Sequence, residues 1–168
     1  NWSDCSNVSF SRLLNGFRSD SAIHKEMLAI LAAVTEVIKA NGGKESSVEY
    51  LGALMTTLDV CESEESLTAL LQLLGMVIKN VPESMLRLKY AEMSKSFTNN
   101  LGKFSESEST AILRSLIGCL SVLLRAQESA LWSSPSTLRV FDSILAFINH
   151  SKPKVRKAAQ HAVCAVLK

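Results

Sequence analysis

The sequence closes with SKPKVRKAAQHAVCAVLK, Ser151 to Lys168, which carries five positive charges and no acidic residue. On a helical wheel its side chains separate into an apolar face and a polar face. The apolar face comprises Val155, Ala158, Ala159, Ala162, Val163 and Val166, and the opposite face carries Lys154, Lys157, His161 and Lys168. Small Ala residues let a neighbouring helix approach closely. We therefore interpret this segment as the packed helix of a repeat and not as a nucleic-acid-binding tail.

Size and composition predict one compact, soluble unit. The chain has 168 residues, is 47% hydrophobic and has a formal net charge of +2. That length allows one sizeable core, and the near balance of charges excludes a polycation of the histone type. The longest apolar runs are too short to cross a membrane, and no cleavable leader is recognisable at the start. We expect no membrane association.

The cysteines are widely separated. Cys5, Cys61, Cys119 and Cys164 include no Cys-x-x-Cys pair, so we interpret them as reduced thiols of a cytosolic or nuclear protein. Two long-range disulfides are the alternative, and three Asn-x-Ser patterns at Asn1, Asn7 and Asn149 would accord with secretion.

Apolar residues recur at helical spacing along almost the whole chain, and strand patterns are nearly absent. The spacing predicts helices over residues 20–41, 46–60, 63–80, 82–102, 105–126 and 135–149, a last helix from Pro153, and a short helix within Ser9 to Gly16. Capping boxes are expected at Ser46 to Glu49 and Ser105 to Glu108. We expect Pro82, Pro135 and Pro153 in first turns, and the Asn-Gly-Gly at residues 41–43 at a helix end.

The helices repeat as pairs. An apolar pair followed by a base occurs at Lys39, Lys79, Arg125 and Lys168, at intervals of 40, 46 and 43 residues. Intervals of roughly 40 to 47 residues are typical of HEAT and armadillo repeats. We therefore predict an all-α, HEAT/ARM-type solenoid of three to four antiparallel helix pairs, with one domain over residues 1–168. The repeat-like units are expected at approximately 1–41, 42–80, 81–126 and 127–168.

The last unit resembles the second half of a HEAT repeat. Pro153, Val155, Arg156, Ala158 and Ala159 match the positions of the usual signature. The Asp usually found in the preceding turn is missing, so an Asp–Arg ladder is not expected here. The apolar face of this helix also leads us to expect that a fragment ending here self-associates through its cut ends.

Three long segments, in order, are similar to one eukaryotic family. HKEMLAILAAVTEVIKANGGKES (residues 24–46), YLGALMTTLDVCESEESLTALLQLL (residues 50–74) and KPKVRKAAQHAVCAVLK (residues 152–168) resemble the N-terminal part of the HEAT-repeat ribosome-biogenesis factors called the ribosomal RNA processing protein twelve family. The likeness covers most of the chain and is weakest over residues 83–110. It rests on collinear similarity and on no single short motif.

The resemblance implies a non-enzymatic scaffold that binds pre-ribosomal particles through protein or pre-rRNA and supports rRNA maturation and subunit export. It also implies a nucleolar and nuclear location with shuttling to the cytoplasm, and an association with a Ran-type GTPase. Two alternatives remain. One is a nuclear-transport-receptor-like HEAT domain that recognises cargo or the GTPase, and the other is a module that binds RNA directly through a basic edge.

Candidate binding residues are basic or aromatic, and no catalytic, metal or cofactor pattern is recognisable. Lys39, Lys79, Arg125 and Lys168 would form a basic edge along stacked units, able to bind phosphates or an acidic protein surface. The alternative is that each base complements the negative C-terminal end of its own helix.

A second candidate lies at the start of the last helix, where Lys152, Lys154 and Lys157 form a basic patch. Positive charge at a helix N-terminus is mildly unfavourable, which makes a binding role worth weighing against a solvated face. Trp132, between two helices, is expected either to anchor a partner or to cover the adjoining helix ends.

Overall fold

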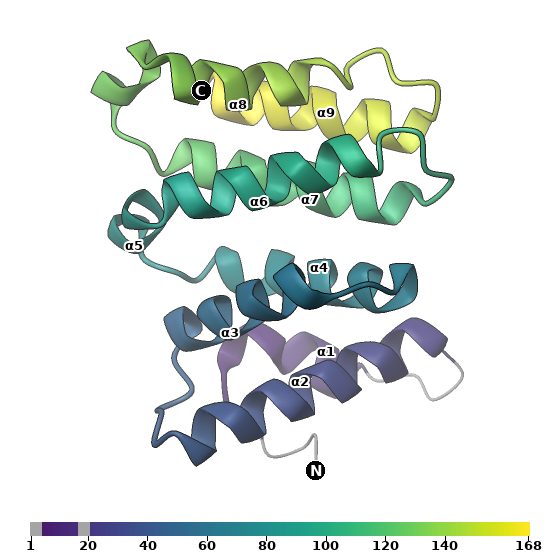
Figure 1. Ribbon diagram of the computed structural model, residues 1–168, viewed down its shortest axis with the longest axis vertical. Coiled ribbons are helices and arrows are strands. Elements are labelled where there is room, and N and C mark those ends of the chain that lie inside the picture. The colour runs from purple at the N-terminus through teal and green to yellow at the C-terminus, as the bar shows by residue number, and fades with distance from the viewer. Residues whose placement is uncertain (1–4, 17–20) are drawn as a thin grey trace. The chain divides into compact units, whose positions relative to one another are not determined.

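The computed structural model describes residues 5–16 and 21–168, and every regular element in these ranges is a helix (Figure 1). The predicted all-α class is confirmed. The chain divides into two compact units, Asn1–Val81 and Pro82–Lys168. The finer division into four repeat-like units stays a prediction. None of the helices in the described part of the chain combines the length and the hydropathy needed to cross a membrane.

The first unit is organised around its last helix. Its elements are η2 (Val8–Phe10), α1 (Ser11–Asn15), α2 (Ala22–Ala40), α3 (Ser47–Val60) and α4 (Glu64–Ile78). Helix α4 packs against α2, α3 and η2. Its predicted apolar stripe is buried and comprises Leu67, Leu70, Leu74 and Val77. The short helix expected within the first twenty residues is present as η2 followed by α1.

The second unit is organised around its third helix. Its elements are α5 (Glu83–Leu88), α6 (Tyr90–Lys103), α7 (Thr110–Arg125), η3 (Ser129–Ser133), α8 (Pro135–Leu145) and α9 (Pro153–Val166). Helix α7 packs against α6, α8 and α9. Its predicted stripe is fully buried and comprises Leu113, Leu116, Leu120 and Leu123.

The turn between α2 and α3 confirms the predicted start and stop signals. Gly42 adopts φ +75°, and the amide of Gly43 donates to the Ile38 carbonyl at 2.9 Å, which together form a Schellman-type helix end. At the start of α3, Ser46 Oγ accepts from the Glu49 amide, and the Glu49 carboxylate accepts from the Ser46 amide. This reciprocal pair is the expected capping box.

The second predicted capping box is wrong. Helix α7 begins at Thr110, and its N-cap Ser109 makes no side-chain cap. Ser105 instead donates its hydroxyl to the Gly102 carbonyl at 3.0 Å, and the Glu108 carboxylate binds Lys152. The capping box does not form here because Lys152, 44 residues away in the sequence, binds the Glu108 carboxylate that the box would need.

Two further boundaries differ from expectation. The helix predicted over 82–102 is interrupted at Lys89, between α5 and α6, and Pro82 occupies the N-cap of α5, one residue before its first turn. In α5, Arg87 Nε donates to the Ala126 carbonyl beyond the end of α7 at 2.7 Å. Pro135 and Pro153 do lie in first turns, as predicted.

Helix α8 buries a different face from the predicted one. The helical spacing predicts a buried stripe of Leu138, Phe141, Leu145 and Ile148, but Leu138 is 43% exposed and the other three are only half-buried. The buried side chains are Thr137, Val140, Ile144 and Phe147. The two stripes are offset by one residue, and contacts with α6, α7 and α9 select the second. Helix α8 also ends at Leu145, earlier than the expected residue 149.

Candidate functional site

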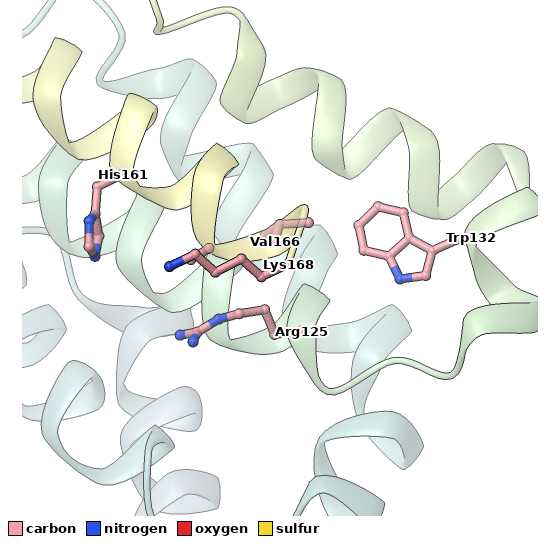
Figure 2. A pocket seen from close by; sticks show the side chains of 6 residues that line it. Arg125, Trp132, His161, Val166 and Lys168 are labelled. Carbon is pink, nitrogen blue, oxygen red and sulfur yellow. The ribbon is translucent and has the colours of Figure 1, made fainter.

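Two of the predicted basic-edge residues, Arg125 and Lys168, line one open pocket in the second unit together with Trp132 (Figure 2). The pocket has a volume of about 540 Å³. Its other lining residues are His161, Ala165 and Val166. Arg125 ends α7, Trp132 lies in η3, and the remaining residues come from α9 or follow it. Packing of α7 against α9 thus joins residues that the sequence analysis assigned to two separate candidate sites.

The pocket has a polar side and an apolar side. In Figure 2 the nitrogen ends of Arg125 and Lys168 point away from Trp132 and toward the side where His161 lies. The indole of Trp132 faces the pocket from the other side, beyond Val166. A ligand in this pocket would therefore meet cationic groups at one end and apolar surface at the other.

Trp132 also supports the fold. Its ring meets the ring of Phe141 on α8 edge to face, with the centroids 5.8 Å apart. An aromatic pair of this geometry contributes roughly 0.5–1.5 kcal/mol beyond area burial. The indole is half-buried, so it both covers α8 and contributes to the pocket wall.

Three of the basic-edge residues lie at the C-terminal ends of their own helices, as expected if each base complements the negative end of its helix. Arg125 Nε donates to the Ser121 carbonyl at 3.4 Å in the last turn of α7. Lys39 lies in the last turn of α2, where its ammonium is 3.9 Å from Glu45 Oε2. Lys79 is the C-cap of α4. A positive charge at each of these positions complements the helix dipole. A continuous row of the four bases stays a prediction.

The predicted basic patch at the start of α9 is divided between two roles. Lys152 Nζ lies 2.5 Å from Glu108 Oε2 and also donates to the Glu108 carbonyl at 3.3 Å. That hydrogen bond, together with the lysine charge, lowers the pKa of Glu108. Lys154 and Lys157 are exposed and carry no ion pair with any described residue. Only these two are available to a partner.

A hydrogen bond that no sequence pattern predicted links the turn between α8 and α9 to the turn between α6 and α7. His150 Nδ1 accepts from the Lys152 amide at 3.1 Å, so the proton of the neutral ring is on Nε2, which donates to the Ser105 carbonyl at 3.2 Å. Arg156 Nη1 donates to the His150 carbonyl at 2.9 Å. With no Asp in the turn, the signature Arg therefore binds a backbone carbonyl. Histidine and Ser lie 45 residues apart, and no sequence pattern links them.

The other signature residues are structural. Val155 and Ala159 are fully buried, Ala158 is half-buried, and Pro153 occupies the first turn of α9. The absence of side-chain bulk at Ala159 allows α9 to lie close against α7. His161, Lys154 and Lys157 lie on the exposed face, as the helical wheel predicted.

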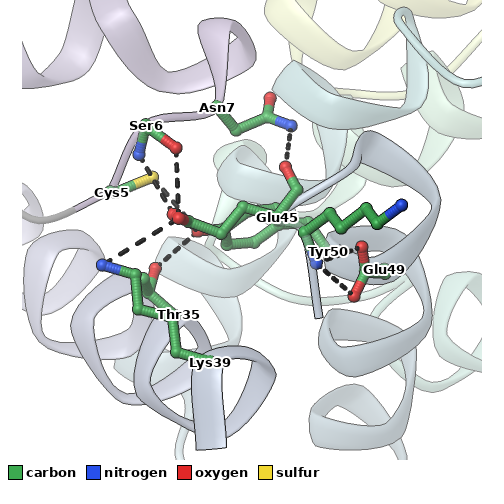
Figure 3. A network of polar contacts seen from close by, with 9 residues as sticks. Cys5, Ser6, Asn7, Thr35, Lys39, Glu45, Glu49 and Tyr50 are labelled. Carbon is green, nitrogen blue, oxygen red and sulfur yellow. Dashed lines mark hydrogen bonds and ion pairs between the residues drawn. The ribbon is translucent and has the colours of Figure 1, made fainter. Parts of the chain in front are cut away.

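In the first unit, Glu45 is the centre of a polar network (Figure 3). Its carboxylate accepts from the Ser6 amide and hydroxyl, each at 3.1 Å, and its carbonyl accepts from Asn7 Nδ2 at 2.7 Å. Glu45 itself has φ +59°, a left-handed conformation that costs a non-glycine residue about 1–2 kcal/mol. The hydrogen bonds to the N-terminal segment offset this strain.

The hydroxyl of Tyr50 extends the network into the core. It donates to Glu45 Oε1 at 3.1 Å. Since a phenol has one proton, the contacts at 2.7 Å with Thr35 Oγ1 and 3.3 Å with Cys5 Sγ place those groups as donors to the Tyr50 oxygen. Tyr50 is fully buried and its ring meets Phe10 edge to face. No sequence pattern indicates this network, because its members are scattered over the segment before η2, helices α2 and α3, and the turn between these helices.

Charge and burial act in opposite directions on this network. Burial would raise the pKa of Glu45, but hydrogen bonds from Ser6 and Tyr50 and the nearby charge of Lys39 outweigh it, so the pKa lies below its usual value of 4.5. Burial, with the Cys5 contact, raises the pKa of Tyr50 far above its usual value. The carboxylate is therefore ionised and the phenol neutral at neutral pH, as their hydrogen bond requires.

Across residues 5–16 and 21–168, no three His, Cys, Asp or Glu side chains gather as metal ligands would. His150 lies in the turn between α8 and α9, and His161 lies on α9. The arrangement offers surface pockets and exposed helix faces, which suit binding.

Comparison with known proteins gives a family and several relatives. The family described as RRP12-like, N-terminal HEAT repeats, matches residues 10–168. The RRP12-like protein of Gallus gallus is 51% identical and that of Homo sapiens 50% identical, each over 166 residues. Both alignments cover 99% of this chain and 13% of the relative. A HEAT-type solenoid is thus the shared fold, in agreement with the prediction.

A more distant relative carries a functional name. Ribosomal RNA-processing protein 12 of Saccharomyces cerevisiae is 29% identical over 159 residues, which cover 85% of this chain and 13% of that protein. The chain thus spans about an eighth of the length of the curated relatives it matches.

Proposed function

This chain belongs to the RRP12-like family, in the region of its N-terminal HEAT repeats, and from that membership we propose that it is a non-enzymatic scaffold segment acting in ribosome biogenesis. In this role it binds pre-ribosomal particles and supports rRNA maturation and subunit export. The protein is nucleolar and nuclear and moves to the cytoplasm with its cargo.

The observation that carries the proposal is the match of the family over residues 10–168, joined to the name of the yeast relative, a ribosomal RNA-processing protein. Identity at about half of the aligned positions over nearly the whole chain supports a shared role for this segment as well as a shared fold.

The surface chemistry supports binding over catalysis. Paired helices bury their apolar stripes within each unit and leave polar faces exposed, as on α9. Such faces present side chains at fixed spacing on a rigid support, and repeat proteins bind partners in this way. The pocket beside Trp132 is one place where a partner can dock.

The test is affinity purification of the full-length protein from nuclear extract, with and without nuclease, in parallel with a version that lacks residues 1–168. We expect the full-length protein to recover pre-ribosomal proteins, and the deletion to recover fewer of them. Recovery that survives nuclease supports a scaffold held by protein contacts.

Two outcomes count against the proposal. Equal recovery with and without the segment would remove this chain from the binding surface. Recovery that disappears on nuclease treatment would favour the direct RNA-binding module in place of a protein scaffold.

A further inference from the structure

We propose that the pocket lined by Arg125, Trp132, His161 and Lys168 is a docking site for a short acidic peptide segment of a protein partner, with one apolar side chain seated against Trp132. The inference rests on the proposed scaffold function and names the kind of partner that this surface recognises.

The two sides of the pocket define the ligand. Trp132 and Val166 form an apolar wall that would take one aliphatic or aromatic side chain. The guanidinium of Arg125 and the ammonium of Lys168 lie on the opposite side. Because Arg125 uses Nε on its own helix, its two terminal nitrogens remain available to a carboxylate. The peptide must therefore carry an apolar residue next to acidic residues.

The exposed face of α9 extends the positive surface away from the pocket. The charges are those of Lys154 and Lys157, which lie seven and four residues before the pocket residue His161, so all three share one helix face. Seven residues of helix span roughly 10 Å, about the length of three residues of an extended peptide. Residues 143–168 contain no Asp or Glu, so no acid on α9 competes for a bound anion.

The same surface is poorly suited to single-stranded RNA. RNA-binding grooves stack successive bases on aromatic faces. Trp132 is the one Phe, Tyr or Trp residue among those that line this pocket, and its ring is half-buried and held edge to face by Phe141. The lysines are point charges that attract any anion, whereas the apolar wall selects a side chain that nucleotides lack.

The experiment uses the full-length protein and fluorescence anisotropy. The probe is a labelled seven-residue peptide with a central Leu flanked on each side by three Asp or Glu residues. One control peptide replaces Leu with Ser, a second replaces the acids with Asn and Gln, and a ten-nucleotide polyuridine serves as the RNA control. The protein variants are Arg125→Glu combined with Lys168→Glu, and Trp132→Ala. The matched control is Lys25→Glu combined with Lys95→Glu, two exposed residues on α2 and α6.

We expect the acidic Leu peptide to bind with a dissociation constant below about 1 mM, and the Arg125/Lys168 double reversal to weaken it about tenfold or more. The matched control should change it less than about twofold. Trp132→Ala should weaken the Leu peptide and leave the Ser peptide unchanged. This difference between peptides separates loss of the apolar wall from misfolding, which would weaken both.

Several results would overturn the inference. The inference is wrong if the acidic Leu peptide does not bind, or if the Arg125/Lys168 double reversal binds this peptide as tightly as the wild type does. It is also wrong if the Leu and Ser peptides bind equally tightly, or if polyuridine binds more tightly than the Leu peptide and the double reversal abolishes that binding.

Purification of pre-ribosomal proteins with the wild-type protein and the double-reversal variant distinguishes failure of the docking site from failure of the proposed function. If peptide binding fails while the wild-type protein still recovers pre-ribosomal proteins, only the docking site is wrong. If the peptide binds and no pre-ribosomal protein is recovered, only the proposed function is wrong.

Discussion

The phenolic hydroxyl of Tyr50 donates a hydrogen bond of 3.1 Å to the carboxylate of Glu45, five residues earlier in the chain. This bond joins the strained residue of the α2–α3 turn to the core of the first unit, because Tyr50 is fully buried and Glu45 has a left-handed backbone. Removal of this hydrogen bond should therefore lower the stability of the first unit.

Replacing Tyr50 with Phe should lower the free energy of unfolding by about 1–3 kcal/mol, because it leaves the buried groups of Cys5 and Thr35 and the half-buried carboxylate of Glu45 without their shared partner. Urea unfolding measures this loss. The matched control is Tyr90→Phe, since the buried Tyr90 hydroxyl makes no hydrogen bond of acceptable geometry in the described residues. An equal loss in the two variants would contradict the role given to the network.

Stability should fall in acid, and Glu45 should contribute to that fall. The folded-state pKa of Glu45 lies below its unfolded value of about 4.5, so its contribution is complete above that pH and is lost as the pH falls through the lower, folded-state pKa. Glu49 shifts in the same direction, because the amide and hydroxyl of Ser46 donate to it. Urea unfolding over pH 2 to 7 should show a shallower acid loss in Glu45→Gln than in the wild type. Parallel profiles would show that Glu45 is not linked to folding.

Gly43→Ala should destabilise the first unit, whereas Gly52→Ala should not. A Cβ on Gly43 would lie 2.9 Å from the Ile38 carbonyl oxygen and would collide with the Glu49 carboxylate. Gly52 lies within α3 with open space around its Cβ position, so Ala there should stabilise the helix by about 0.5–1 kcal/mol. Thermal unfolding of both variants should move the midpoint in opposite directions. An unchanged or raised midpoint in Gly43→Ala would contradict the close approach at that position.

Ala159→Leu should lower the free energy of unfolding of the second unit by about 1–3 kcal/mol, because the position is fully buried where α9 packs against α7. Gln160→Leu, on the exposed face of the same helix, provides the control and should change stability by less than about 0.5 kcal/mol. Hydrogen exchange should show faster exchange in α7 and α9 of the first variant. Unchanged exchange there would mean that the interface has room for a larger side chain.

Much of the fold could be predicted because its signals are local. Stripes such as Leu113 to Leu123 have the period of a helix, and the Ser46–Glu49 box and the Asn41–Gly43 end satisfy backbone groups within a few residues. Resemblance also predicted the family, since long collinear similarity does not depend on where any side chain lies in space.

The candidate site was predictable only as separate parts. Arg125, Lys168 and Trp132 were each singled out, but their meeting in one pocket depends on how α9 packs against α7 and how η3 packs against α8. The Glu45 network and the His150–Ser105 hydrogen bond gave no sequence signal, because hydrogen bonds between residues about 40 positions apart leave no periodicity.

The helices, their order and most of their ends could be predicted from the sequence, because helical periodicity and capping act within one or two turns of chain. Packing between elements selects which stripe of α8 is buried, whether Glu108 caps a helix or binds Lys152, and which bases share a pocket with Trp132. In each of these cases two arrangements are compatible with the local sequence. The difference in free energy between them comes from contacts with residues distant in the chain.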